Sequence, residues 1–108
     1  MTTNQESWEQ FDLVAGVLSA DPDDDVTAEG ERLLVHGRVF AYLDEDQLVV
    51  DLPVARAADL TGRGVATEAT APTPPRGRWV AVSDVEDWTE LATEGHQFVG
   101  EPAVGGDS

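Results

Sequence analysis

Apolar residues near the start of the chain recur every three or four positions, which is the spacing of an amphipathic helix. Ser7 followed by Gln10 has the form of a capping box, and Asp21-Pro22 ends the pattern because the residue before a proline is disfavoured in a helix. We therefore predict a first helix over residues 7–20. Its apolar stripe consists of Trp8, Phe11, Val14, Ala15 and Leu18.

Three short runs of β-prone residues follow, and short polar turns separate them. Connections this short favour antiparallel hairpins, so the runs predict a three-strand meander. The middle run is apolar on both sides, with one aliphatic and one aromatic face, and we expect its strand to lie centrally and to be covered on both faces. The runs are Arg32–Val35, Arg38–Leu43 and Gln47–Leu52. The two faces of the middle run are Val39, Ala41 and Leu43 against Arg38, Phe40 and Tyr42.

A second, shorter helix is predicted after Pro53, because proline suits the first turn of a helix. Gly62-Arg63-Gly64 ends this helix. From Gly64 to Arg78 the chain is poor in apolar residues, so we predict an exposed connection that is partly extended and partly polyproline-like. Its prolines are Pro72, Pro74 and Pro75.

The last part of the chain predicts one more strand and one more helix. Trp79–Val82 is β-prone, and Ser83 with Glu86 forms a second capping box that opens the helix. Small and polar residues from Gly100 onward predict a frayed tail. The apolar stripe of the helix consists of Val85, Trp88, Leu91, Ala92, Gly95, Phe98 and Val99.

The order of these elements is typical of a single α+β domain. We expect N-terminal, middle and C-terminal helices to pack on an antiparallel sheet made of the meander and the later strand. The length of 108 residues is enough for one modest core. We predict a flexible segment over residues 1–6, the domain over 7–99 and a disordered tail over 100–108.

Two segments resemble a known group of proteins. The stretch LLVHGRVFAYLDEDQLVVDLP, residues 33–53, combines an apolar strand, a glycine with a following arginine, Phe-Ala and an acidic turn. Together with RWVAVSDVEDWTELATEGHQFVG, residues 78–100, it is similar to the N-terminal domain of the competence regulator TfoX (Sxy) and to MmcQ/YjbR-like proteins. The resemblance implies the same meander, a regulatory function and no attached reaction; DNA binding is suggested for some of these proteins.

One position departs from the pattern of these families. Arg38 matches their basic strand position, but Asp51 stands where a lysine often ends the third strand of the meander. The resemblance therefore implies that a basic face of the sheet has become an acidic one.

Charge is the unusual feature of the composition. Asp and Glu number 22 against six basic residues, all arginine, and the formal net charge is −16. Nucleic acid and anionic membranes would repel such a chain, so neither is expected as a partner. A GC-rich genome, a salt-rich habitat or a basic partner would each explain the acidity, and composition leaves these explanations open.

The chain has no cysteine, which excludes disulfides and thiolate chemistry. No apolar run approaches the length of a membrane span, and the first ten residues are polar. We therefore expect a cytoplasmic protein that is a monomer or a small homo-oligomer.

Metal-binding and catalytic patterns are incomplete. Asp21, Asp23 and Asp25 imitate the start of a calcium loop, but Val26 and Arg32 stand where glycine and glutamate are needed, so we predict a solvated acidic turn. We expect no metal, no cofactor and no catalytic residue.

The histidines and serines also have structural explanations. His36 and His96 form no metal-binding spacing, and we expect them at a turn and near a helix end. No nucleophile motif surrounds a serine; we expect caps, a helix end and a tail at Ser7, Ser19, Ser83 and Ser108.

The candidate ligand patch combines arginine with an aromatic side chain. Arg76, Arg78 and Trp79, joined by Arg38, gather much of the basic charge, and such groups bind anions or flat rings. The alternative is that Trp79 belongs to the core and that the arginines pair with nearby carboxylates.

The leading functional hypothesis is a non-enzymatic regulatory or protein-interaction module with a protein partner. A DNA-binding regulator of the TfoX type is a second hypothesis, which the net charge opposes. A small-ligand binder or enzyme with a carboxylate-lined pocket is the third.

Overall fold

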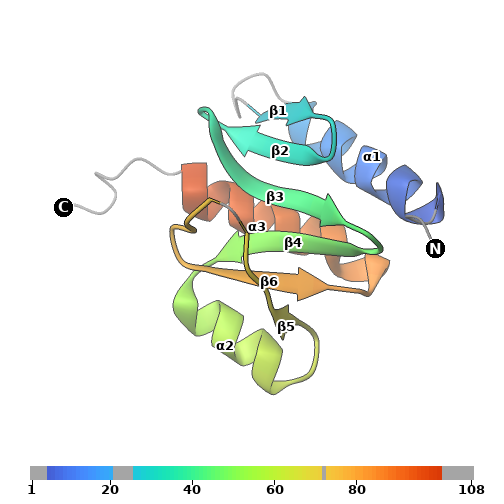
Figure 1. The fold of residues 1–108 in the computed structure, drawn as a ribbon. Helices are drawn as coiled ribbons and strands as arrows, with labels where there is room; N and C mark the ends of the chain where they lie inside the picture. Colours follow the sequence, from blue (N-terminus) through green and yellow to red (C-terminus); the bar gives the residue numbers. More distant parts are fainter. Residues whose placement is uncertain (1–4, 21–25, 72, 101–108) are drawn as a thin grey trace.

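The protein folds as a six-stranded antiparallel sheet with helices packed against it (Figure 1). The computed structural model describes residues 5–20, 26–71 and 73–100. This architecture confirms the predicted α+β class. In chain order the elements are α1 (Gln5–Ser19), β1 (Val26–Glu29), β2 (Arg32–Val35), β3 (Arg38–Asp44), β4 (Gln47–Leu52), α2 (Val54–Gly62), β5 (Thr67–Glu68), β6 (Arg78–Val82), the 3₁₀ turn η2 (Val85–Asp87) and α3 (Trp88–Gly100).

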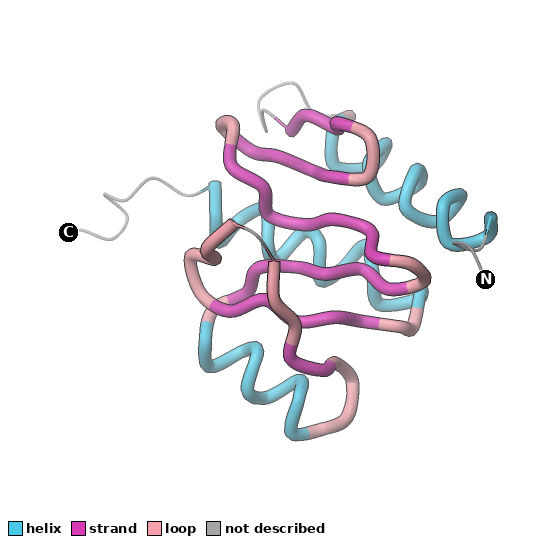
Figure 2. The backbone as a smooth tube through the Cα atoms, in the orientation of Figure 1, coloured by secondary structure: helices cyan, strands magenta, loops and turns pink. Residues whose placement is uncertain are grey.

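The strands lie in the order β1-β2-β3-β4-β6-β5, and each neighbouring pair is antiparallel (Figure 2). The predicted meander is β2–β4, and the predicted later strand is β6. The edge strands β1 and β5 were not predicted. Both are short and mostly exposed, so neither carries the apolar alternation that marks a half-buried strand.

The main core lies between the sheet and the helices. Helix α3 crosses β2, β3 and β4, and α1 packs beside it. The helix approaches the strands closely at Gly95, where an added Cβ would lie 2.6 Å from Cγ2 of Val50. Trp88 is fully buried, and its indole N–H donates a hydrogen bond to the carbonyl of Val82 at 2.9 Å. This side of the sheet is therefore closed by tight apolar packing.

Strand β3 contains a register shift that changes the faces of its side chains. Leu33 pairs with Ala41 and Leu34 pairs with Val39, which leaves Phe40 as the extra residue. Phe40 and Ala41 consequently both join the main core, whereas Val39 and Tyr42 lie on the other side of the sheet. The prediction of one aliphatic and one aromatic face was wrong for this reason. The strand is nevertheless central and packed on both sides, as predicted.

The first predicted capping box does not form. Helix α1 already includes Gln5 and Glu6, so Ser7 lies within the helix and does not cap it. The Ser7 hydroxyl instead donates to Oδ1 of Asp46 at 3.3 Å, which ties α1 to the turn between β3 and β4.

The second predicted capping box is replaced by a different cap. Oδ1 of Asp84 accepts the backbone N–H of Glu86 at 3.1 Å and caps η2, which precedes α3. The Ser83 hydroxyl accepts a hydrogen bond from Nε2 of Gln47 at 2.9 Å. The serine therefore joins β4 to the end of β6 and does not begin the helix.

The predicted acidic turn at residues 21–25 and the tail from residue 101 lie outside the described residues, whereas Gly100 still belongs to α3. Among the helices that the structure describes, none has the length and apolar character needed to cross a membrane.

Candidate functional site

The side of the sheet opposite the main core carries a second, smaller apolar cluster, and we call this side the open face. The described parts of the connection between β5 and β6, residues 69–71 and 73–77, cross it and are seen in front of the sheet in Figure 1. The members of the cluster are Val49, Trp79 and Ala81, with Val39, Tyr42, Ala69 and Ala71 packed against them.

The β5–β6 connection is anchored by a buried carboxylate. Asp51 on β4 is 0% exposed, and its two carboxylate oxygens accept the backbone N–H groups of Arg76 at 2.6 Å and Gly77 at 2.9 Å. The resemblance implied that Asp51 makes one face of the sheet acidic. This expectation was wrong, because the carboxylate faces the connection and is shielded from solvent. The connection is also less exposed than predicted, since Ala69 and Ala71 are half-buried.

Two aromatic side chains hold the same connection through their polar ends. The indole N–H of Trp79 donates to the carbonyl of Thr73 at 2.8 Å, and the Tyr42 hydroxyl donates to the carbonyl of Thr70 at 3.1 Å. Their rings meet edge to face with centroids 5.8 Å apart. These contacts fix the connection to the open face.

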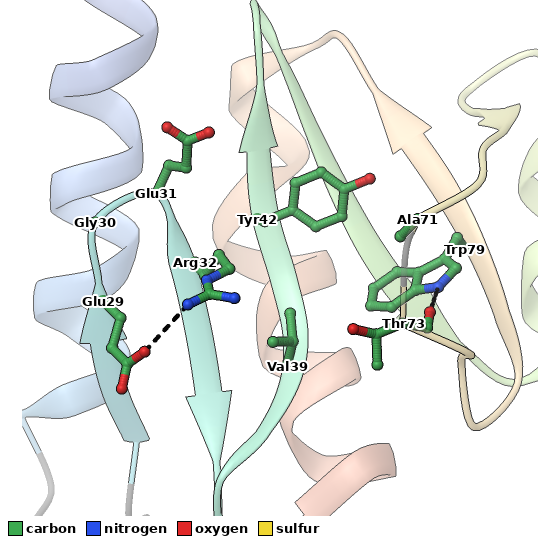
Figure 3. Close-up of a pocket in the computed structure, with 9 residues that line it drawn as sticks. All are labelled: Glu29, Gly30, Glu31, Arg32, Val39, Tyr42, Ala71, Thr73 and Trp79. Atoms are coloured by element: carbon green, nitrogen blue, oxygen red, sulfur yellow. Dashed lines mark hydrogen bonds and ion pairs between the residues drawn. The ribbon is translucent and has the colours of Figure 1, made fainter.

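A hollow of about 480 Å³ remains beside the connection, and we call it the aromatic hollow (Figure 3). Val39 and Tyr42 from β3 lie between Arg32 on β2 and Trp79 on β6. The turn between β1 and β2 forms one wall, and the connection forms the other. The lining residues are Glu29, Gly30, Glu31, Arg32, Val39, Tyr42, Ala71, Thr73 and Trp79.

A second hollow of about 600 Å³ adjoins the first, and we call it the basic hollow. It lies beside the His36-Gly37 turn, whose two positive φ angles of 54° and 79° follow the tight hairpin pattern. The two hollows share Arg32, Val39 and Thr73 and together form the open-face groove. The basic hollow is lined by Arg32, Leu34, His36, Gly37, Arg38, Val39, Thr73 and Pro74.

The charged and titratable residues that line the groove differ in their partners. Nη2 of Arg32 lies 3.3 Å from Oε1 of Glu29. Both side chains are 54% exposed, so the ion pair is weak. Arg38 forms no ion pair with any residue that the structure describes. Burial, and then the nearby charge of Asp44, raise the pKa of Tyr42, which keeps its hydroxyl protonated near neutral pH.

The structure brings two of the four predicted patch residues to the groove. Trp79 lines the aromatic hollow, where it is 3% exposed, and Arg38 lines the basic hollow. The other two arginines lie elsewhere. Nη1 of Arg78 lies 3.4 Å from Oε2 of Glu68. Arg76 lies over the ring of Phe98, and its guanidinium carbon is 5.7 Å from the ring centroid.

Sequence reasoning missed Arg32, Val39 and Tyr42 as groove residues. The sequence identified Arg32 only as the first residue of a strand. Its ion pair with Glu29 was not predicted because strand β1, which carries Glu29, was not predicted. Val39 and Tyr42 were placed on opposite faces because the shift at Phe40 was not anticipated. The sequence of β3 did indicate that the open face is covered, because a strand that is apolar on both sides needs a covering layer on each face.

The remaining candidates that lie in the described residues are placed as follows. Within residues 5–20, 26–71 and 73–100, no three His, Cys, Asp or Glu side chains are placed to share a metal ion. The calcium-like aspartates 21, 23 and 25 fall outside these ranges. His36 lies at the β2–β3 turn, and His96 packs on Phe40 with ring centroids 5.6 Å apart. Ser19 donates to the carbonyl of Ala15 at the end of α1.

Comparison with known proteins adds no further guide to the site. No protein-family model, no curated protein and no solved structure matches this chain.

Proposed function

We propose that this protein is a non-enzymatic interaction module that binds an extended segment of a partner protein in the open-face groove. The observation that carries the proposal is the junction of the two hollows through Arg32, Val39 and Thr73. An extended peptide presents side chains at regular spacing, so neighbouring residues enter neighbouring sites on a sheet surface.

The side chains of the groove suit recognition of a peptide. Tyr42 and Trp79 supply rigid aromatic surface, and such residues are enriched where proteins bind one another. Glu29, Glu31 and Arg32 add a polar rim at the turn between β1 and β2. We infer that an apolar side chain of the partner lies in the aromatic hollow.

The chemistry of the groove supports binding more than catalysis. Tyr42 has a raised pKa, and its hydroxyl already donates a hydrogen bond to the carbonyl of Thr70, so it is a poor base or nucleophile near neutral pH. Glu29 is engaged by Arg32. These contacts favour a module without a reaction of its own.

We further propose membership of the TfoX N-terminal or MmcQ/YjbR-like group. Its support is the order of a meander, helix α2, strand β6 and helix α3, which follows the two segments that carry the resemblance. DNA binding of the TfoX type is opposed by the net charge of −16, because few basic groups are present to neutralise phosphates.

The proposal is tested by selecting short peptides from a display library on the wild-type protein and measuring their affinities by calorimetry. The variant Val39→Arg fills the floor shared by both hollows, and we expect peptide binding to fall at least about tenfold, as for loss of a central contact. Leu13→Arg adds the same charge on α1, where Leu13 is 60% exposed, and should leave affinity unchanged. Equal affinities for both variants would contradict the proposal.

A small-molecule ligand is the second candidate, because the aromatic hollow of about 480 Å³ has the volume of an ordinary ligand site. A metabolite library screened by thermal shift would then raise the melting temperature of the wild type and of Leu13→Arg, but not of Val39→Arg. This outcome, with no selected peptide, would replace the partner segment by a metabolite.

A further inference from the structure

The two walls of the aromatic hollow differ in charge. The turn between β1 and β2 contributes Glu29 and Glu31, whereas the β5–β6 connection contributes Ala71 and Thr73, which are uncharged. Figure 3 shows both glutamates on the side of the turn, across β3 from Trp79. An occupant of the hollow therefore meets carboxylates on one side only, and we call this side the acidic wall.

Positive charge at the acidic wall is too small to balance its carboxylates. Among the described residues that line the hollow, Arg32 alone is basic, and its Nη2 lies 3.3 Å from Oε1 of Glu29. Glu31 is exposed and forms no ion pair with any residue in the described part of the chain. Two carboxylates against one guanidinium leave one negative charge uncompensated.

Other charged residues near the open face do not reverse this sign. Arg38 pairs with Val35 at the far end of the β2–β3 ladder from Arg32, and His36 lies in the turn at that same end. Asp44 lies close enough to raise the pKa of Tyr42 and adds negative charge near the hollow. The acidic wall therefore keeps its preference for a cation.

We propose that the partner segment places a basic side chain, arginine or lysine, against Glu29 and Glu31 while a neighbouring apolar residue lies in the aromatic hollow. The inference rests on the proposed interaction function and adds the class of partner residue that the groove selects. The pair between Glu29 and Arg32 is half-exposed and contributes little stability, so an incoming cation shares Glu29 at small cost. The planar fork of an arginine matches the two oxygens of a carboxylate.

The floor of the hollow supports the same class of residue. Arginine and lysine have long aliphatic stems that pack on apolar surface while the charged end stays near water. Val39 and Tyr42 are half-buried and offer such a surface next to the acidic wall. The backbone N–H of Leu43 donates to the carbonyl of Glu31 at 2.8 Å, which holds this residue beside β3. The net charge of −16 also steers a basic segment toward the protein.

Pairs of small probes test the charge preference in an NMR titration at low salt. Acetyl-Arg-Phe-amide is compared with acetyl-citrulline-Phe-amide, in which a neutral side chain of similar shape replaces the guanidinium. A second pair with the two residues in reverse order covers the other direction of the segment. We expect the charged member of at least one pair to bind about fivefold more tightly, the gain of one exposed ion pair, and to shift the Glu31 side-chain resonances.

Matched variants show whether the acidic wall carries this preference. Glu31→Gln keeps the length and polarity of the side chain and should abolish the difference between charged and neutral probes. Glu9→Gln removes the same charge from an exposed position on α1 and should preserve the difference. Melting temperatures of the two variants control for folding.

A third variant should strengthen binding, which a disturbed fold does not do. Arg32→Gln releases Glu29 and removes the cation that competes for it, so the charged probe should bind more tightly than to the wild type. Arg63→Gln makes the same change of net charge at the end of α2, where Nη2 of Arg63 lies 3.5 Å from Oδ2 of Asp59. This control should leave the affinity at the wild-type value.

The outcomes separate this inference from the proposed function. Equal binding of charged and neutral probes, with shifts at Tyr42 and Trp79, would overturn the basic residue and leave the groove as a peptide site. A preference that survives in Glu31→Gln, or that falls equally in Glu9→Gln, would also overturn it, because the effect would then be one of net charge. Unchanged or weaker binding in Arg32→Gln would count against it in the same way. Absence of any shift at groove residues would contradict both proposals.

Discussion

The two faces of the sheet are covered in different ways. On one face, α1 and α3 bring large apolar side chains such as Phe11 and Trp88 into a continuous core, and Gly95 lets the helix approach the strands closely. On the open face, the β5–β6 connection covers a small cluster and is held by a few polar contacts from Asp51, Trp79 and Tyr42. Stability therefore resides mainly on the first face, and the second is free to carry a binding groove.

The largest effect is expected from the helix-covered face. Trp88→Ala removes a fully buried indole and its hydrogen bond to Val82, and we expect a loss of about 3–5 kcal/mol in the free energy of unfolding. Urea denaturation followed by circular dichroism measures this loss. Trp8→Ala, at a half-buried position on α1, should cost clearly less. Equal losses would show that the core is not centred where the structure places it.

A smaller and more local effect is expected from the anchor of the open face. Asp51→Ala leaves the N–H groups of Arg76 and Gly77 without their acceptor, and we expect a cost of about 1–3 kcal/mol. Hydrogen exchange should become faster at these two amides while the amides of α3 stay protected. Asp12→Ala, on the exposed side of α1, is the control. Uniform loss of protection would mean that the two faces are not separable.

The smallest effect concerns the tyrosine of the groove and appears only in alkali. The folded state raises the pKa of Tyr42 through burial and the charge of Asp44, so folding favours the protonated hydroxyl. Stability from this group is present below the unfolded pKa of about 10 and is lost as pH rises through the folded value. Tyr42→Phe should flatten this alkaline decline in melting temperature. An unchanged decline would assign it to other groups.

The sequence predicted more of the helix-covered face than of the open one, although it gave the wrong caps for α1 and α3 and the wrong face for Phe40. Apolar spacing located the stripes of α1 and α3, the three strands of the meander and the strand that begins near Trp79, because burial against one layer imposes a regular period. Strands β1 and β5 were not predicted because short exposed edge strands form through backbone hydrogen bonds and need no regular pattern of apolar residues. The register shift at Phe40 was not predicted either, since an extra residue in a strand does not change the amino-acid composition.

Long-range polar contacts were the other limit. The sequence suggested a surface role for Asp51, but the carboxylate meets residues 25 and 26 positions away. Of the four residues suggested as a ligand patch, Trp79 lines the aromatic hollow and Arg38 lines the basic hollow, and their role in ligand binding stays a prediction. Arg76 and Arg78 were grouped with them by proximity in sequence, and the fold turns them to Phe98 and Glu68.

The most direct measurement of the central claim is a map of backbone and indole NMR shifts on adding a selected peptide. Our account predicts that the shifts concentrate at Arg32, Val39, Tyr42 and the indole N–H of Trp79, and that α1 and α3 remain unchanged. A map centred on the exposed side of α1, around Leu13 and Val17, would contradict the assignment of binding to the open face.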